Sequence, residues 1–395
     1  MKISQEHDKT KVSKQKVERK LRKQLKGTDT KETLDTFKNK KELNMLATRY
    51  ADTMLSVKGL ERFGSCGDWL QFATTENYDS TKLYKANFCK HRFCPMCNMR
   101  KAVKDAMALG VVLDSLERDG YEFLFLTLTV PNCSGEELPA VLDNMNACVK
   151  RMFEKKKVKD SIKGYIRKVE VTTDQVKTIN KQWIKKRSEE YCERKGLKIG
   201  DVNPNYNTYH PHMHFILVVE KEYFRKHSKQ YIPQAEWLAI WQDVNGSEAV
   251  GLDIRKVRTD GQTTAVEEIA KYSAKDSHLY HSESVFATFY IALRGRKLLT
   301  TSGIANERMK AYKSGELDYI LEEQHDKRRE AQKEKGEAPH IYTKLLNASW
   351  VTRMTKKQRK VMDYALKLND MSEEQIKEFN NAKDLALAFE IKNKN

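Results

Sequence analysis

Three histidines alternate along the chain just before a run of apolar residues. They are His210, His212 and His214, in the stretch His-Pro-His-Met-His-Phe-Ile-Leu-Val-Val over residues 210–219. Side chains alternate along a β-strand, so we expect the three imidazoles on one face and Met213 on the other. Imidazoles held close together are common ligands of divalent metals. Because the stretch continues as core sequence, a metal site explains them better than unrelated surface histidines.

A carboxylate on a second predicted strand is a candidate third ligand. Glu170 lies in an otherwise apolar-alternating stretch, and a buried carboxylate normally needs a cation. A glutamate on an open sheet face explains the pattern equally well. The long excursion from Asp174 to Tyr209 also separates the two strands by more than a tight hairpin. Glu170 and His210 are therefore the less secure candidates, beside His212 and His214.

A predicted helix over residues 264–275 carries a third group of polar side chains. Glu268, Tyr272 and Lys275 follow the spacing i, i+4 and i+7, which places them on one helical face. A tyrosine whose phenol is activated by a base or cation can attack phosphorus. Taken alone, the stretch is an ordinary amphipathic helix.

Four cysteines have a spacing that suits a structural zinc site. They follow the pattern C-x22-C-x4-C-x2-C, with His91 as a spare ligand, and unligated thiols are the alternative. These four are Cys66, Cys89, Cys94 and Cys97. The remaining cysteines, which lack such spacing, are Cys133, Cys148 and Cys192.

The periodicity around these residues predicts an α+β fold with a central, mostly antiparallel sheet flanked by helices. Predicted strands cover residues 123–130, 165–172, 210–219 and 252–257. Predicted helices cover residues 99–118, 136–153, 233–244 and 264–275, with partial helix over 181–194 and a last helix from Ser372. We expect four segments: a basic, partly disordered arm (1–59), a cysteine-rich region with a helix (60–118), the sheet domain (119–299) and a helical C-terminal region (300–395).

Composition indicates a polyanionic partner. The 395 residues carry a formal charge of +18, which favours nucleic acid, although a membrane surface would fit the same charge. No stretch approaches the roughly 20 apolar residues of a membrane span. The basic N-terminal segment lacks the apolar centre of a secretory signal. We therefore expect a cytoplasmic protein with no membrane association and with reduced thiols.

Several motifs occur together in an order that resembles a known superfamily. Phe-Leu-Thr-Leu-Thr (125–129), His-Met-His (212–214) and Tyr-Ser-Ala-Lys (272–275) resemble the three motifs of the HUH endonucleases. With Phe88–Cys97, Arg167–Thr172 and Glu268–Tyr272, the pattern is more similar still to the rolling-circle plasmid replication initiators of Gram-positive bacteria. The resemblance covers about residues 60 to 295.

This resemblance implies a fold and a reaction. The sheet domain would be HUH-like, with a small zinc knuckle before it. Mg²⁺ or Mn²⁺ held by His212 and His214 would polarise a phosphate of the plasmid origin. Tyr272 would then nick one strand, leaving a 5′-phosphotyrosine and a 3′-OH primer. Glu268 would activate water for termination, and Lys275 would stabilise the phenolate or phosphate charge.

The implied DNA partner is double-stranded at the binding site and single-stranded at the nick. Residues 300–395 could recognise the origin, form a homodimer or bind a host helicase. Two alternatives stay open: an HUH transposase or mobilisation relaxase with the same chemistry, and a non-enzymatic zinc-ribbon DNA-binding regulator. A glutamate before a single tyrosine favours the initiator over the transposase.

Overall fold

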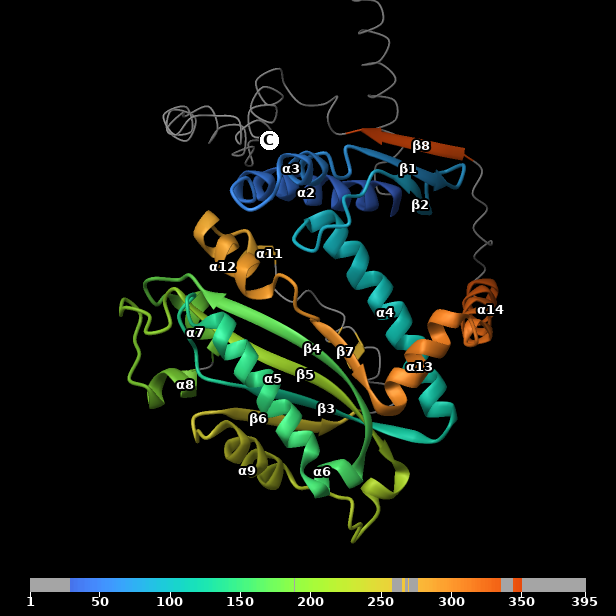
Figure 1. Ribbon diagram of the computed structural model, residues 1–395. Helices are drawn as coiled ribbons and strands as arrows, with labels where there is room; N and C mark the ends of the chain where they lie inside the picture. The colour runs from blue at the N-terminus through green and yellow to red at the C-terminus, as the bar shows by residue number, and fades with distance from the viewer. Residues whose placement is uncertain are drawn as a thin grey trace, which may run out of the picture. The chain divides into compact units, whose positions relative to one another are not determined.

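The computed structural model describes residues 29–187, 189–257, 265–266, 269, 276–334 and 344–349. Contacts divide the chain into two units, residues 1–98 with 327–395 and residues 99–326. Each unit has its own antiparallel sheet (Figure 1). The α+β class and the antiparallel pairing predicted from the sequence are confirmed.

The first unit is built around a three-stranded sheet in the order β2-β1-β8. Its elements are α2 (Asp29–Tyr50), α3 (Val57–Gly64), β1 (Trp69–Thr74), β2 (Thr81–Ala86) and β8 (Lys344–Ser349), and α4 (Pro95–Arg118) begins in it. Leu70 and Phe72 are buried at alternate positions of β1, as expected for a strand with one face on a core. Phe37 of α2 packs edge to face on Phe72, with 5.5 Å between ring centroids.

Two parts of this unit differ from the sequence-based expectation. Residues 29–50, assigned to a basic arm, form the helix α2, which contacts α3 and β2. Residues 344–349, assigned to a helical region, form β8, which pairs with β1 along its length. A six-residue strand has too weak a pattern of its own, and its pairing with a strand far away in sequence decides its conformation.

The second unit is a five-stranded antiparallel sheet with helices on both faces. The strands are β3 (Tyr121–Thr129), β4 (Ile162–Asp174), β5 (Thr208–Glu220), β6 (Gly251–Lys256) and β7 (Leu299–Ser302), in the spatial order β6-β3-β5-β4-β7. The helices are α5 (Leu138–Glu154), α6 (Lys156–Ser161), α7 (Lys181–Arg187), α8 (Glu189–Arg194), the 3₁₀ helix η1 (Lys221–Phe224), α9 (Gln234–Asn245), α11 (Asp276–Leu279), α12 (Glu283–Leu293), α13 (Gly303–Ser314) and α14 (Asp318–Glu334), together with α4 from residue 99.

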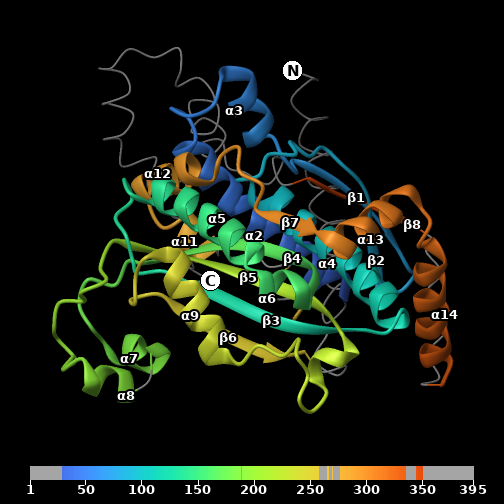
Figure 2. The ribbon, with the colours of Figure 1, turned by 60° about the horizontal axis from the view of Figure 1, so that its bottom comes forward.

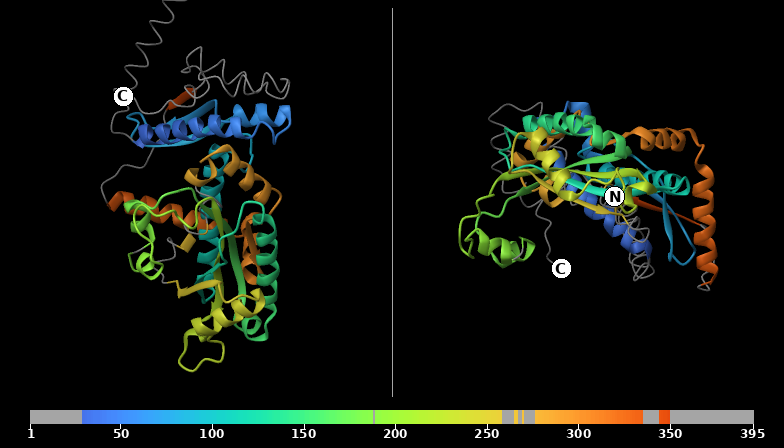
Figure 3. Two further views of the ribbon diagram at one scale, coloured as in Figure 1. Left: turned by 90° about the vertical axis from the view of Figure 1, so that its left-hand side faces the viewer. Right: turned by 90° about the horizontal axis from the view of Figure 1, so that it is seen from below.

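The two faces of this sheet are covered by different helices, as the edge-on view in Figure 3 shows. Helices α5 and α9 pack together over one face. Helices α4 and α13 cover the other, where Leu113 and Met309 join a core that includes Ile166 and Ile216. Within the predicted helix 264–275, the structure describes Ala265, Val266 and Ile269, which are helical. Ala265 and Ile269 are buried in this same core.

Strands β4 and β5 pair despite the long excursion between them. Asp174, the last residue of β4, is the register partner of Thr208, the first of β5. The excursion has a small core of its own, in which Trp183 is buried beside Ile179 and Cys192. Figure 2 shows α7 and α8 standing off from this end of the sheet. Since the excursion folds on itself, it leaves the strand register undisturbed.

Two glycines allow β4 to approach the start of α13. A Cβ atom on Gly164 would lie 2.5 Å from the carbonyl oxygen of Ser302. Gly303 has a φ of +54°, and a Cβ there would lie 2.2 Å from the carbonyl oxygen of Lys163. Larger residues would push β7 and the start of α13 away from β4.

Among the described helices, none is long and apolar enough to cross a membrane. The predicted last helix from Ser372 lies outside the described residues.

Candidate functional site

Neighbouring strands bring Glu170, His212 and His214 together, and we call these three residues the histidine cluster. Glu170 of β4 is the register partner of His212 on β5, and the donor atoms of the three side chains lie within 4.8 Å of one another. Glu170 Oε2 is 3.1 Å from His214 Nε2 and 3.6 Å from His212 Nε2. The strand pairing therefore gathers the two histidines and the carboxylate that the sequence singled out.

The histidine cluster is shielded from solvent. The side chains of Glu170, His212 and His214 are 7%, 13% and 9% exposed. Burial alone would raise the pKa of Glu170, but hydrogen bonds from His212 and His214 outweigh it and hold the pKa well below its usual range. The buried Nδ1 of His212 has no hydrogen-bond partner among the described residues. The histidine cluster thus contains a carboxylate anion and nitrogen atoms that can bind a metal, which is a donor set suited to a divalent cation.

Thr127 is a member of this site that the sequence analysis missed. It is the register partner of His214 on β3, and its Oγ1 lies 3.1 Å from His214 Nδ1. Such a contact fixes the ring orientation of a histidine and the nitrogen that carries the proton. Its sequence signals are its place in the Phe-Leu-Thr-Leu-Thr motif (125–129) and its alternation with the apolar residues of its strand, but neither assigned it a role.

His210 lies beside the histidine cluster rather than in it. Its ring centroid is 5.2 Å from that of His212, but its nitrogens are not among the converging donor atoms. Burial, together with the nearby charges of His212 and Arg187, lowers the pKa of His210 to about 4. Tyr272, Glu268 and Lys275 lie outside the described residues.

The cysteines Cys66, Cys89, Cys94 and Cys97 form a second convergent group in the first unit, which we call the cysteine cluster. Their sulfurs lie within 4.8 Å of one another, with Cys97 Sγ 3.6 Å from both Cys66 Sγ and Cys89 Sγ. His91 is not part of the group, because its Nδ1 accepts a hydrogen bond from the backbone of Phe93. The four-cysteine arrangement can hold a structural metal.

Hydrogen bonds prepare the cysteine cluster for negative charge. The backbone N–H of Lys90 donates to Cys97 Sγ at 3.1 Å, and that of Cys89 donates to Cys66 Sγ at 3.3 Å. Hydrogen bonds from the other three thiols lower the pKa of Cys97, whereas burial is the main cause that raises the pKa of Cys94. Without a cation, repulsion between neighbouring thiolates allows few of the four thiols to lose a proton. A bound metal would instead deprotonate all four.

Helix α2 supports the cysteine cluster through two buried polar residues that the sequence did not single out. Lys41 is 1% exposed, and its Nζ contacts the carbonyl oxygen of Cys66 at 3.1 Å and Asp68 Oδ1 at 2.6 Å. Asn44 Nδ2 lies 3.5 Å from Cys94 Sγ and donates to the carbonyl of Phe63 at 2.9 Å. These contacts fix the loops that carry the cysteines.

Comparison with known proteins then identifies the chain. The family model described as "Replication protein" (Rep_1) matches residues 80–382. The chain belongs to this family of plasmid replication proteins. The resemblance stated from its motifs is thereby confirmed.

Similar Rep proteins come from several Gram-positive bacteria. The protein rep of Staphylococcus aureus is 33% identical over 246 residues, which cover 62% of this chain and 94% of that protein. The protein rep of Streptococcus pneumoniae is 31% identical, covering 67% and 77% of the two chains, and that of Bacillus amyloliquefaciens is 29% identical, covering 74% and 86%. No solved structure matches. The whole histidine cluster and three of the four clustered cysteines lie within the span that matches the Rep family; Cys66 precedes it.

Proposed function

We propose that the chain is a metal-dependent, site-specific DNA nickase and strand transferase that initiates rolling-circle replication of a plasmid. The observation that carries the proposal is the convergence of Glu170, His212 and His214 on one sheet face, in a family of plasmid replication proteins. The net charge of +18 supports binding to origin DNA. An antiparallel sheet with paired histidines on a central strand supports the HUH-like fold.

The histidine cluster fits a divalent metal by its donor chemistry. Two imidazoles and one carboxylate converge, and the carboxylate supplies the negative charge that Mg²⁺ or Mn²⁺ prefers. A bound ion would polarise the scissile phosphate. Nitrogen atoms of His212 and His214 would be ligands of this ion, and Thr127, whose Oγ1 lies 3.1 Å from His214 Nδ1, would hold the ring of His214 in position.

Tyr272 is the proposed nucleophile. Its phenol oxygen would bond to phosphorus while the P–O3′ bond breaks, so the phenolic proton leaves and the 3′ oxygen ends as a hydroxyl that primes synthesis. Ala265 and Ile269 support this placement, because both are buried over the sheet face that carries the histidine cluster, and Tyr272 follows Ile269 by three residues. We further propose that Glu268 activates water in the terminating cleavage and that Lys275 stabilises the phenolate or phosphate charge.

Two other functions would account for part of the sequence. A transposase or mobilisation relaxase would use the same chemistry, but the family match is to replication proteins. A non-enzymatic regulator would leave a buried carboxylate and two histidines without a use. A host helicase or a second copy as partner of residues 300–395 stays a prediction.

A nicking assay tests the proposal directly. The purified protein is incubated with supercoiled plasmid carrying its origin, with Mg²⁺, with Mn²⁺ or with EDTA. We expect open circles only with metal, together with transfer of 5′ label from DNA to protein. Metal-dependent nicking without a covalent adduct would exclude the tyrosine mechanism, and no nicking at all would favour the regulator.

Thr127→Val is expected to weaken the metal site without unfolding the strand. Valine keeps the shape of threonine but removes the oxygen that contacts His214 Nδ1. Loss of such a supporting contact typically costs roughly 10–100-fold in metal affinity or activity. The measurement is the Mn²⁺ concentration at half-maximal nicking. Thr129→Val is the matched control, since Thr129 lies on the same strand and its hydroxyl bonds to no described residue.

We also propose that the cysteine cluster binds one structural Zn²⁺. Elemental analysis of protein purified under reducing conditions should find about one zinc per chain. Cys94→Ser should abolish zinc retention and lower the free energy of unfolding by several kcal/mol, because structural zinc supplies on the order of 10 kcal/mol in zinc-finger peptides. Cys133→Ser is the control. Cys133 is buried and lies outside the cluster, and a serine there can keep the contact with the carbonyl oxygen of Tyr209. A zinc-free wild-type protein that unfolds at the same temperature with and without added zinc would exclude the site.

A further inference from the structure

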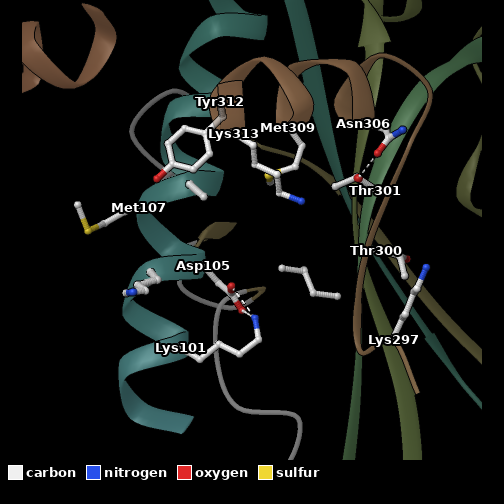
Figure 4. Close-up of a pocket in the computed structure, with 13 residues that line it drawn as sticks. Lys101, Asp105, Met107, Lys297, Thr300, Thr301, Asn306, Met309, Tyr312 and Lys313 are labelled. Carbon is white, nitrogen blue, oxygen red and sulfur yellow. Dashed lines mark hydrogen bonds and ion pairs between the residues drawn. The ribbon is translucent and has the colours of Figure 1, made fainter. Parts of the chain in front are cut away.

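A pocket of about 920 Å³ lies between α4, β7 and α13 in the second unit (Figure 4). Its size is at the upper end of pockets that hold small organic ligands. It opens beside the edge strand of the sheet, and no residue of the histidine cluster lines it. Neither the proposed nicking reaction nor the zinc site uses it.

The lining of this pocket is strongly positive. Lys101, Lys104, Lys297 and Lys313 line it, against a single carboxylate, Asp105. Both oxygens of Asp105 are bound by Lys101 Nζ at 2.7 Å, as Figure 4 shows. Lys104, Lys297 and Lys313 have no carboxylate within ion-pair distance among the described residues. The pocket therefore presents uncompensated ammonium groups to an anionic ligand.

The floor of the pocket is apolar and partly aromatic. Leu299, Met309 and Tyr312 line it, and all three also pack against the core under α4 and α13. Tyr312 is half-buried, so its ring is held in place while one side faces the pocket (Figure 4). A rigid aromatic ring among lysines suits a nucleobase with its phosphates, because bases stack on aromatic side chains irrespective of sequence.

The pocket and the histidine cluster share one face of the sheet. Leu299 of β7 is the register partner of Lys168 on β4, and Glu170 is two residues further along β4 on the same face. From the strand rise and spacing, the backbone positions of Leu299 and Glu170 are roughly 8 Å apart. A DNA strand whose phosphate lies at the histidine cluster can therefore reach the pocket within a few nucleotides.

We propose that this pocket binds an unpaired nucleotide of the strand to be nicked, with the base against Tyr312 and the phosphates on Lys297 and Lys313. The proposal rests on the proposed nicking function and adds the surface that holds the strand. A paired base cannot enter a pocket, so the site selects single-stranded DNA. Binding there would keep the origin open next to the scissile phosphate.

The double variant Lys297→Gln/Lys313→Gln tests the charge of the pocket. The probe is a fluorescein-labelled, mixed-sequence single strand of about 20 nucleotides, with a duplex of the same sequence beside it, both in EDTA. We expect roughly ten-fold weaker binding of the single strand and a salt slope shallower by about 1.4, the value for two lost phosphate contacts. The matched control is Lys150→Gln/Lys159→Gln, which removes the same charge from exposed lysines of α5 and α6.

Crosslinking tests the base contact. A single strand containing 5-iododeoxyuridine should crosslink on irradiation to the peptide that contains Tyr312, as mass spectrometry would show, and the duplex should not. Equal loss of binding in the two double variants, or equal loss for single strand and duplex, would overturn the proposal. Both assays are read without metal or cleavage, so a protein that binds here but never nicks would contradict the proposed function alone.

Discussion

Tyr272→Phe should abolish nicking and covalent adduct formation while leaving binding to origin DNA unchanged. Phenylalanine keeps the aromatic ring but removes the one oxygen that can bond to phosphorus. Removal of a nucleophile typically lowers the rate by a thousand-fold or more, on the order of the losses measured for catalytic serines. The measurement is single-turnover nicking of supercoiled plasmid at saturating Mn²⁺, with a 5′-labelled strand to detect the adduct.

Tyr280→Phe and Tyr290→Phe are the matched controls for this experiment. Both tyrosines follow Tyr272 in the chain, and both are buried, with their rings packed on Phe286. Their variants should nick at close to the wild-type rate. If Tyr272→Phe nicks normally and one of these two does not, the nucleophile is that tyrosine and the motif assignment of residues 272–275 is wrong.

The parts of the site that alternate along one strand could be predicted from the sequence. The period of two in His210-Pro-His-Met-His214 is enough to place the histidines on one face, and Met213 and Phe215 are indeed buried on the other. The cysteine spacing was likewise sufficient, since the sulfurs converge. Patterns of this kind involve residues that are close together along the chain, so they can be recognised in a single sequence.

The parts that depend on pairing between distant segments could not be predicted. The role of Glu170 stayed open because the register of β4 and β5 is set across the excursion, where Asp174 meets Thr208. Lys41 and Asn44 reach the cysteine cluster from a helix with few large apolar residues, and their burial depends on polar contacts that leave no periodic signal. Strand β8 depends on β1 in the same way.

Glu170→Gln should separate metal binding from folding at the histidine cluster. Glutamine keeps the size of the side chain and can still hydrogen-bond to His212 and His214, so we expect the strand pairing and the fold to persist. It removes the only negative charge among the three converging side chains, and a hard divalent ion depends on that charge. Loss of a residue that only supports a metal ligand lowers metal affinity by up to roughly 100-fold. Because Glu170 is a proposed ligand itself, we expect Mn²⁺ affinity to fall by more than that.

The measurement for Glu170→Gln combines Mn²⁺ binding, followed by electron paramagnetic resonance, with the metal dependence of nicking. We expect nicking to be lost at low Mn²⁺ concentration and recovered in part at high Mn²⁺ concentration. DNA binding in EDTA should stay unchanged, because affinity for DNA comes mainly from lysine and arginine contacts to phosphates. Glu220→Gln is the control for loss of one carboxylate, because Glu220 is half-buried at the other end of β5, where it pairs with Lys163. Wild-type Mn²⁺ affinity in Glu170→Gln would show that the ion is held without this carboxylate. His210, whose ring lies beside His212, would then be the next ligand to test.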